Sequence, residues 1–184
     1  MKPPFVVVDV FGGIVSKVSE ILLPTLREFD DKIEAVNYLY GHPIEIIETL
    51  GQRDKSSTFQ FKKYPLVALF QDFPERHGNV IGLDSTVTLN IIIARATLAT
   101  YKADERYTNN FKPVLYPIYQ ELLQQISLSK TFLNYGANSL GHTKYDRLYW
   151  GRDGLYKNDR NVFNDFLDCI EIKGLQLKLN LKNC

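Results

Sequence analysis

Two apolar segments followed by a long amphipathic pattern constrain the fold of this chain more than any other feature. Residues 66–70 contain no polar side chain, and residues 87–94 are rich in β-branched side chains. Between residues 108 and 126, apolar side chains instead recur every three or four positions, which is typical of a helix with one buried face. The order strand, strand, helix predicts an α+β fold, in which α-helices flank a mixed or antiparallel β-sheet.

Both apolar segments have the composition of buried strands. Pro65 is tolerable as the first residue of a strand, so residues 65–71 predict a fully buried strand. Residues 85–99 alternate between two faces and predict a long central strand. In the helix that follows, Asn110 is a plausible N-cap, and Pro113 falls in the first turn. Pro117 lies further in, so we expect a kink there or a helix that begins at Pro117.

The N-terminal third of the chain predicts further elements of the same fold. Its first apolar pattern predicts an amphipathic helix that begins near Asp9 and is stopped by Pro24. Residues 35–40 predict a short strand, and Gly41-His42-Pro43 predicts a turn. Residues 44–50 fit a strand or a helix equally well.

The C-terminal third is less regular. Residues 163–172 lead into a turn predicted at Lys173-Gly174, and residues 175–181 alternate apolar and polar side chains. This alternation predicts a strand with one solvated face, which ends the sheet or pairs with a neighbouring molecule. Residues 129–161 are rich in aromatic side chains and turn residues, and predict an extended loop or arm. We expect residues 1–184 to form a single domain.

Composition bounds the possible functions. Twenty-two basic and 21 acidic residues give a net charge of +1, which argues against a broad nucleic-acid-binding face but allows a local basic patch. We expect no secretory signal and no membrane span, because no apolar run approaches about 18 residues. Cys169 and Cys184 are then expected to be free thiols in a reducing compartment.

The chemical side chains form no established catalytic or metal-binding motif. Asp72, Glu75 and His77 lie within six residues and could hold a divalent cation, but Pro74 and Gly78 in the same segment favour a solvated turn. His142 and Asp146 are four residues apart in a segment whose glycines disfavour a helix, so His142 is expected in a surface loop. We therefore expect no enzymatic activity, no cofactor and no metal site.

Several segments along the chain resemble a known class of structural proteins. They are Asp9-Val10-Phe11 through Val18, Asn37-Tyr38-Leu39-Tyr40-Gly41, Lys63-Tyr64-Pro65-Leu66-Val67-Ala68-Leu69, the β-branched strand, Tyr119-Gln120-Glu121-Leu122-Leu123 and Phe163-Asn164-Asp165-Phe166-Leu167-Asp168-Cys169-Ile170-Glu171-Ile172. Together they resemble neck and tail proteins of tailed bacteriophages, of the tail terminator or head–tail joining class. The likeness extends to the ring proteins of crAss-like phages, which infect Bacteroidetes hosts.

The resemblance implies a structural virion protein that forms a homo-oligomeric ring at the portal–tail junction, after assembly in the host cytoplasm. Its implied partners are other neck, portal and tail proteins, together with double-stranded DNA that passes without sequence specificity. No catalytic residue is carried over by the resemblance.

A ring also needs contacts between unlike surfaces of neighbouring copies. The aromatic arm and the last strand offer the residues for such contacts, and we expect the interface to include Tyr149, Trp150, Arg152, Tyr156, Leu177 and Leu179. Two alternatives stay open. One is a small enzyme whose site gathers Asp72, Glu75, His77 or His142, and the other is a monomeric protein-binding module.

Overall fold

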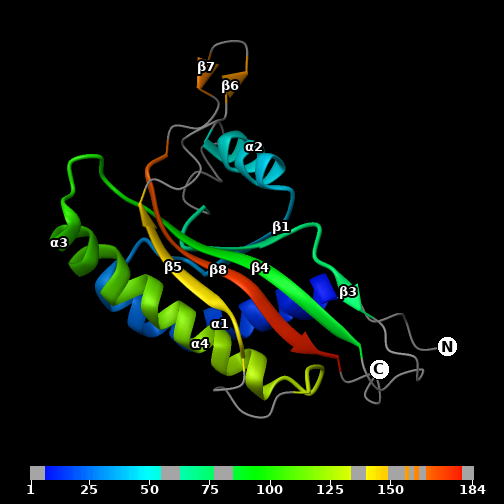
Figure 1. Ribbon diagram of the computed structural model, residues 1–184. Helices are drawn as coiled ribbons and strands as arrows, with labels where there is room; N and C mark the ends of the chain where they lie inside the picture. The colour runs from blue at the N-terminus through cyan, green and yellow to red at the C-terminus, as the bar shows by residue number, and fades with distance from the viewer. Residues whose placement is uncertain are drawn as a thin grey trace.

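One six-stranded β-sheet with helices packed on it forms the body of the protein, as the computed structural model shows (Figure 1). The structure describes residues 7–54, 63–76, 85–133, 140–148, 156–157, 160–161 and 165–179. The sheet is mixed, with one parallel pair of strands among antiparallel pairs. This confirms the predicted α+β class.

The described elements are five helical segments and eight strands. The helical elements are α1 (Val7–Phe29), α2 (Pro43–Asp54), α3 (Ala103–Arg106), the π-helical η1 (Tyr107–Leu115) and α4 (Tyr116–Leu128). The strands are β1 (Asn37–Gly41), β2 (Leu66–Phe70), β3 (Glu75–Arg76), β4 (Thr86–Ala96), β5 (Thr143–Leu148), β6 (Tyr156–Lys157), β7 (Arg160–Asn161) and β8 (Leu167–Lys178).

The strand order of the sheet is β1-β2-β4-β8-β5, with the short β3 added beside β4. β1 and β2 are parallel, and helix α2 lies between them in the chain, as a parallel connection requires. All other pairs in this sheet are antiparallel. β1 and β5 are therefore the outer strands at the two ends of this order, and the short β3 pairs only with β4.

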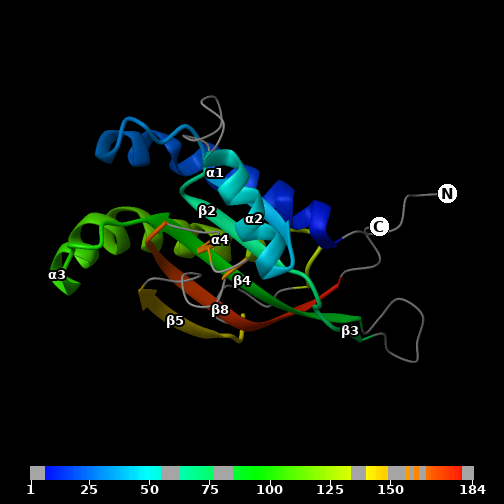
Figure 2. The same cartoon turned by 90° about the horizontal axis from the view of Figure 1, so that it is seen from above.

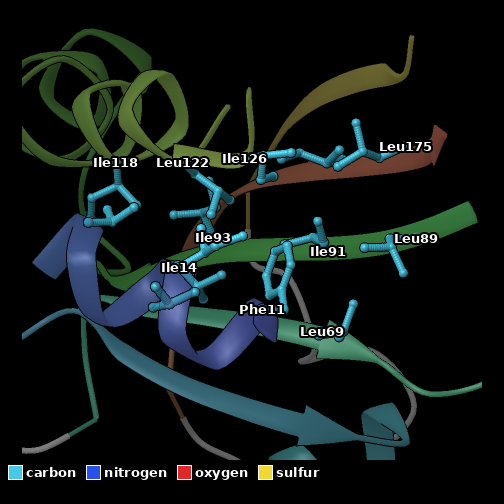
Figure 3. Packing of buried hydrophobic residues seen from close by; sticks show 14 of the residues in the cluster. Phe11, Ile14, Leu69, Leu89, Ile91, Ile93, Ile118, Leu122, Ile126 and Leu175 are labelled. Atoms are coloured by element: carbon cyan, nitrogen blue, oxygen red, sulfur yellow. The ribbon is translucent and has the colours of Figure 1, made fainter. Parts of the chain in front are cut away.

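One face of the sheet is covered by α1 and by the helical run from α3 through η1 to α4. Phe11 and Ile14 of α1 and Ile118 and Leu122 of α4 pack against strand side chains such as Ile91 (Figure 3). Each full burial of such a side chain contributes about 1.5–3 kcal/mol. The apolar stripes that the sequence places on these helices face this core.

The residues that the structure describes cover the opposite face only in part. Ile46, Ile47 and Leu50 of α2 pack on β2 and on the end of β4, where Ile92 and Ala94 are buried. Strands buried on both faces have no polar alternation, which explains the continuous apolar runs in the sequence. The segment that fits strand or helix equally well is thus helix α2, with Pro43 as its first residue, where a missing N–H is harmless.

Two expected boundaries, one at a proline and one at a glycine, were wrong. Pro24 does not end α1, which continues to Phe29 because Leu26 is fully buried and anchors the last turns in the core. Lys173-Gly174 is not a turn, since β8 runs through it. Both residues face Asn90 of β4 in a β-bulge, where Gly174 has a φ of 67° and donates its N–H to the Asn90 side chain.

The long helix also begins earlier than predicted. Helical structure starts at Ala103, and the Glu105 carboxylate accepts a hydrogen bond from the Lys102 N–H. Pro113 lies within η1, and Pro117 occupies the first turn of α4. The wider π-helical turn, closed by the Tyr116 N–H on the Phe111 carbonyl, accommodates the backbone of both prolines.

The arm predicted at residues 129–161 is wrong in part, because residues 143–148 form β5 and pair with β8. β5 is an outer strand with few buried side chains, so its sequence lacks the apolar alternation that identifies a strand.

Candidate interaction surfaces

The residues predicted for an interface divide into three groups. Tyr149, Trp150 and Arg152 lie outside the described residues, and Tyr156 is described only as part of the β6 backbone. Two others, Leu177 and Leu179, have exposed fractions of 1% and 3%.

Leu177 and Leu179 therefore pack in the core of the subunit, and their prediction as interface residues is wrong for the folded subunit. β8 is an internal strand between β4 and β5, so the predicted position at the end of the sheet is also wrong. The alternation itself is confirmed, because Gln176 and Lys178 between the leucines are exposed. It identified the buried face of a strand correctly but could not identify the neighbouring strands.

The first outer strand, β1, carries no charged residue. The Asn37 N–H bonds the Pro65 carbonyl, and the Gly41 carbonyl accepts from the Gln71 N–H, so odd-numbered residues of β1 direct their backbone groups toward β2. In a parallel pair, the even-numbered residues of β1 then direct their N–H and C=O groups away from β2, toward the open edge of the sheet. These residues are Tyr38 and Tyr40, of which Tyr40 is 42% exposed.

The second outer strand, β5, has two exposed large side chains. Tyr145 and Leu148 are 42% and 50% exposed. The strand also carries three charged residues, a composition that usually discourages pairing with another chain. Here the charges are engaged within the subunit, because Lys144 pairs with Asp146 at 2.5 Å and Arg147 pairs with Glu171 of β8. The apolar side chains are thus the available groups of this edge.

Beyond α2, the second face of the sheet is polar and basic. The cations on it are Arg76 of β3, Arg147 of β5, and Lys173 and Lys178 of β8, while Glu171 is the only carboxylate that strands β3, β4, β8 and β5 place there. Among the described residues of these four strands, four cations and one anion give a net charge of +3, although the whole chain has only +1. Such a local excess favours anionic partners.

Aromatic and polar groups accompany these cations. The Arg147 guanidinium lies 4.8 Å from the centre of the Tyr145 ring, and the Lys173 ammonium lies 5.7 Å from it. Thr86, Thr88 and Asn90 of β4 add neutral hydrogen-bonding groups. Figure 2, seen from above, shows α1 and α4 on one side of β4 and β8, with β5 following at the edge of the sheet.

A pocket of about 330 Å³ lies where β4 leaves the sheet, and it is lined by Phe29, Asp30, Arg95, Ala96, Thr97, Leu98, Tyr101, Asn109 and Asn110. Arg95 donates to Asp30 at 2.8 Å, and burial lowers the pKa of its guanidinium. Arg95 Nη1 and Thr97 Oγ1 are buried and have no hydrogen-bond partner among the described residues. Unpaired buried donors are costly, so the pocket can receive a group that bears carbonyl or carboxylate oxygens.

A buried ion pair supports the wall of this pocket. Arg106 donates to Asp168 at 2.6 Å and to the Tyr101 carbonyl at 2.9 Å, while Asn110 donates to the other Asp168 oxygen at 2.7 Å. η1 places Asn110 in this network, rather than at the predicted helix N-cap. Arg106 and Asp168 are far apart in the sequence, so no local sequence pattern identifies their ion pair.

A second polar cluster joins α4 to β5. Tyr116 donates to Asp146 at 2.9 Å, and Tyr119 lies 2.8 Å from His142. Burial and the Asp146 carboxylate raise the pKa of Tyr116 to about 12. The pKa of Tyr119 is also raised, mainly by burial, so neither phenol is prepared to act as a base or nucleophile. This cluster therefore fastens the helix to the outer strand.

The alternative acidic and histidine site finds no support in this arrangement. Asp72, Glu75 and His142 do not line the pocket, and His77 lies outside the described residues. Within the described ranges, no three His, Cys, Asp or Glu side chains come together as a metal site.

The described helices include none that is both long enough and apolar enough to span a membrane. Comparison with known protein families and with curated proteins found no match to this chain.

Proposed function

We propose that the protein is a structural subunit of a homo-oligomeric ring at the portal–tail junction of a tailed bacteriophage. In this proposal it carries out no reaction and resides in the virion. It contacts further copies of itself, neighbouring neck or tail proteins, and the double-stranded DNA that passes through the ring. The phage resemblance of the sequence gives the setting, and the geometry of the subunit supports the assembly.

The observation that carries the proposal is the difference between the two outer strands. β1 exposes an aromatic side chain and no charge, whereas β5 exposes Tyr145 and Leu148 among internally paired charges. Contacts between unlike surfaces are heterologous, and they generate a closed ring when the rotation between copies closes. The helices packed on the sheet supply the rigid body that a constant rotation requires.

The basic second face of the sheet supports the DNA channel. The charged side chains that give its net charge of +3 all lie on the same side of one sheet. In a ring, such a face is repeated in every copy around one wall of the assembly. Cations that meet phosphates give attraction without sequence preference, as a passing duplex requires.

Native mass spectrometry and negative-stain microscopy of the purified protein test this proposal. We expect closed rings with one subunit number. The variant Trp150→Ala should weaken assembly while leaving the far-ultraviolet circular dichroism unchanged, because aromatic residues dominate interface energetics. Rings of unchanged stability in this variant would remove the arm from the interface, and a monomer at all concentrations would overturn the proposal itself.

A second function is favoured by the pocket at Arg95. Its unpaired donor and its apolar rim of Phe29 and Leu98 also suit a small ligand with a carbonyl or carboxylate group. A solitary subunit that binds or converts such a molecule would replace the ring proposal.

A further inference from the structure

The directions of the outer strands determine how two copies can join. β1 runs parallel to β2, β2 antiparallel to β4, β4 antiparallel to β8, and β8 antiparallel to β5. Across the sheet, β5 therefore runs opposite to β1. When a second copy is placed beside the first with the same strand directions, β5 of one copy meets β1 of the next as an antiparallel pair.

We propose that strand β5 of each copy pairs antiparallel with strand β1 of its neighbour, so that one β-sheet continues around the assembly. This inference rests on the proposed ring and names the surface that builds it. A rotation axis roughly along the strands maintains their directions from copy to copy. The contact joins unlike edges, so it leaves neither β1 nor β5 unpaired once the ring has closed.

The backbone of β1 is prepared for this contact. Tyr38 and Tyr40 direct their N–H and C=O groups away from β2, so two hydrogen-bonded pairs with β5 would form about four backbone bonds. Figure 3 shows β1 as the strand on the far side of β2 from β4. The absence of charge in β1 removes the usual barrier to strand addition.

The side chains determine which residues meet. Tyr38 points to the α1 face, where its ring contacts Phe11, so Leu39 points to the α2 face. On β5, Asp146 points to the α4 face, where Tyr116 bonds it, and Tyr145 and Arg147 point to the α2 face. In a continuous sheet Leu39 therefore meets an odd-numbered residue of β5.

Engineered disulfides test this parity. Leu39 directs its backbone groups toward β2, so toward a neighbour it occupies a non-hydrogen-bonded position, where Cα atoms lie about 4.5 Å apart and a disulfide fits. Leu39→Cys is combined in turn with Thr143→Cys, Tyr145→Cys or Arg147→Cys. The matched controls combine it with Lys144→Cys or Asp146→Cys. Every variant carries Cys184→Ser, while Cys169 stays, because it is buried and burial raises its thiol pKa.

After mild oxidation, denaturing gels without reductant should show a ladder beyond the dimer for at least one odd-numbered partner. The even-numbered partners and the single-cysteine variants should show no such ladder. Equal ladders from odd and even partners, or none at all, would overturn the strand pairing.

Native mass spectrometry of the same samples before oxidation separates the two levels of the proposal. Rings without a ladder would leave the ring in place and remove the β5–β1 contact, whereas monomers would remove both. Tyr40→Lys offers a second test that leaves the β1–β2 ladder intact. It should convert rings to monomers, and Tyr40→Phe should preserve them, whereas intact rings in Tyr40→Lys would contradict the contact.

Discussion

Arg106 is the largest side chain that is almost completely buried in the described part of the protein, and it forms an ion pair with the buried Asp168. Both Asp168 oxygens are occupied, one by Arg106 and one by Asn110. Removing one partner of such a pair leaves a buried charge without compensation. The network therefore links α3, η1 and β8 through three side chains.

Asp168→Ala should lower the free energy of unfolding by about 3–5 kcal/mol, because it removes the carboxylate that balances the charge of the buried Arg106 guanidinium. Asn110→Ala, which removes only one hydrogen bond to the carboxylate, should cost about 1–3 kcal/mol. Urea denaturation of both variants measures the difference. Equal losses would show that the ion pair itself adds nothing.

Gly174 is required by its backbone conformation rather than by space. Its φ of 67° is in the left-handed region, and an added Cβ would meet nothing within 4 Å. Gly174→Ala should therefore destabilise the protein by about 1–2 kcal/mol through backbone strain alone.

Gly13→Ala is the matched control, since the space around it is also open but it lies within helix α1. It should stabilise the protein by about 0.5–1 kcal/mol. A loss of stability at Gly13, or none at Gly174, would contradict this assignment of the β-bulge.

At the scale of elements, the pKa of the Tyr116 phenol reports on the contact between α4 and β5. Its pKa of about 12 exceeds the ordinary value of 10.0 because of burial and the Asp146 carboxylate. Asp146→Asn should lower this pKa toward 10, which an ultraviolet titration of the phenol measures. The unfolded chain releases this proton at lower pH than the folded one, so stability should fall as pH rises from about 10 to 12. An unchanged Tyr116 pKa in the Asp146→Asn variant would contradict the hydrogen bond between the two side chains.

The sequence predicts the elements whose pattern is local. The buried β2 and the long β4 follow from apolar composition, and the stripe of α4 follows from helical periodicity. Long-range contacts decided the rest. β5 is a strand only because β8 pairs with it, and Pro24 stays within α1 only because Leu26 packs in the core.

The surfaces were less predictable than the core for the same reason. Lys178 lies in a strand that the sequence identifies, but Lys173 was predicted in a turn, and Arg76 and Arg147 join these lysines only through pairing with β4 and β8. The outer position of a strand depends on the order of the whole sheet. An interface built on β1 and β5 therefore has no signal in a single sequence.

At the scale of the whole molecule, the basic sheet face predicts weak binding of duplex DNA that depends on salt. Replacing Arg147, Lys173 and Lys178 by glutamine should lower the slope of log affinity against log salt by about 2.7, or about 0.9 per phosphate contact. Fluorescence anisotropy with a short labelled duplex measures it. The triple replacement of Lys17, Lys102 and Lys112, exposed residues on or next to the helices that cover the other face, is the control and should leave the slope unchanged.

The oligomeric state of the purified protein tests the account most directly. Native mass spectrometry over a range of protein concentrations on the order of 10 µM measures the fractions of monomer and assembly. The account predicts a single closed oligomer of several subunits that appears as a ring in negative stain. A protein that stays monomeric throughout, or that forms only a two-fold symmetric dimer, would contradict it.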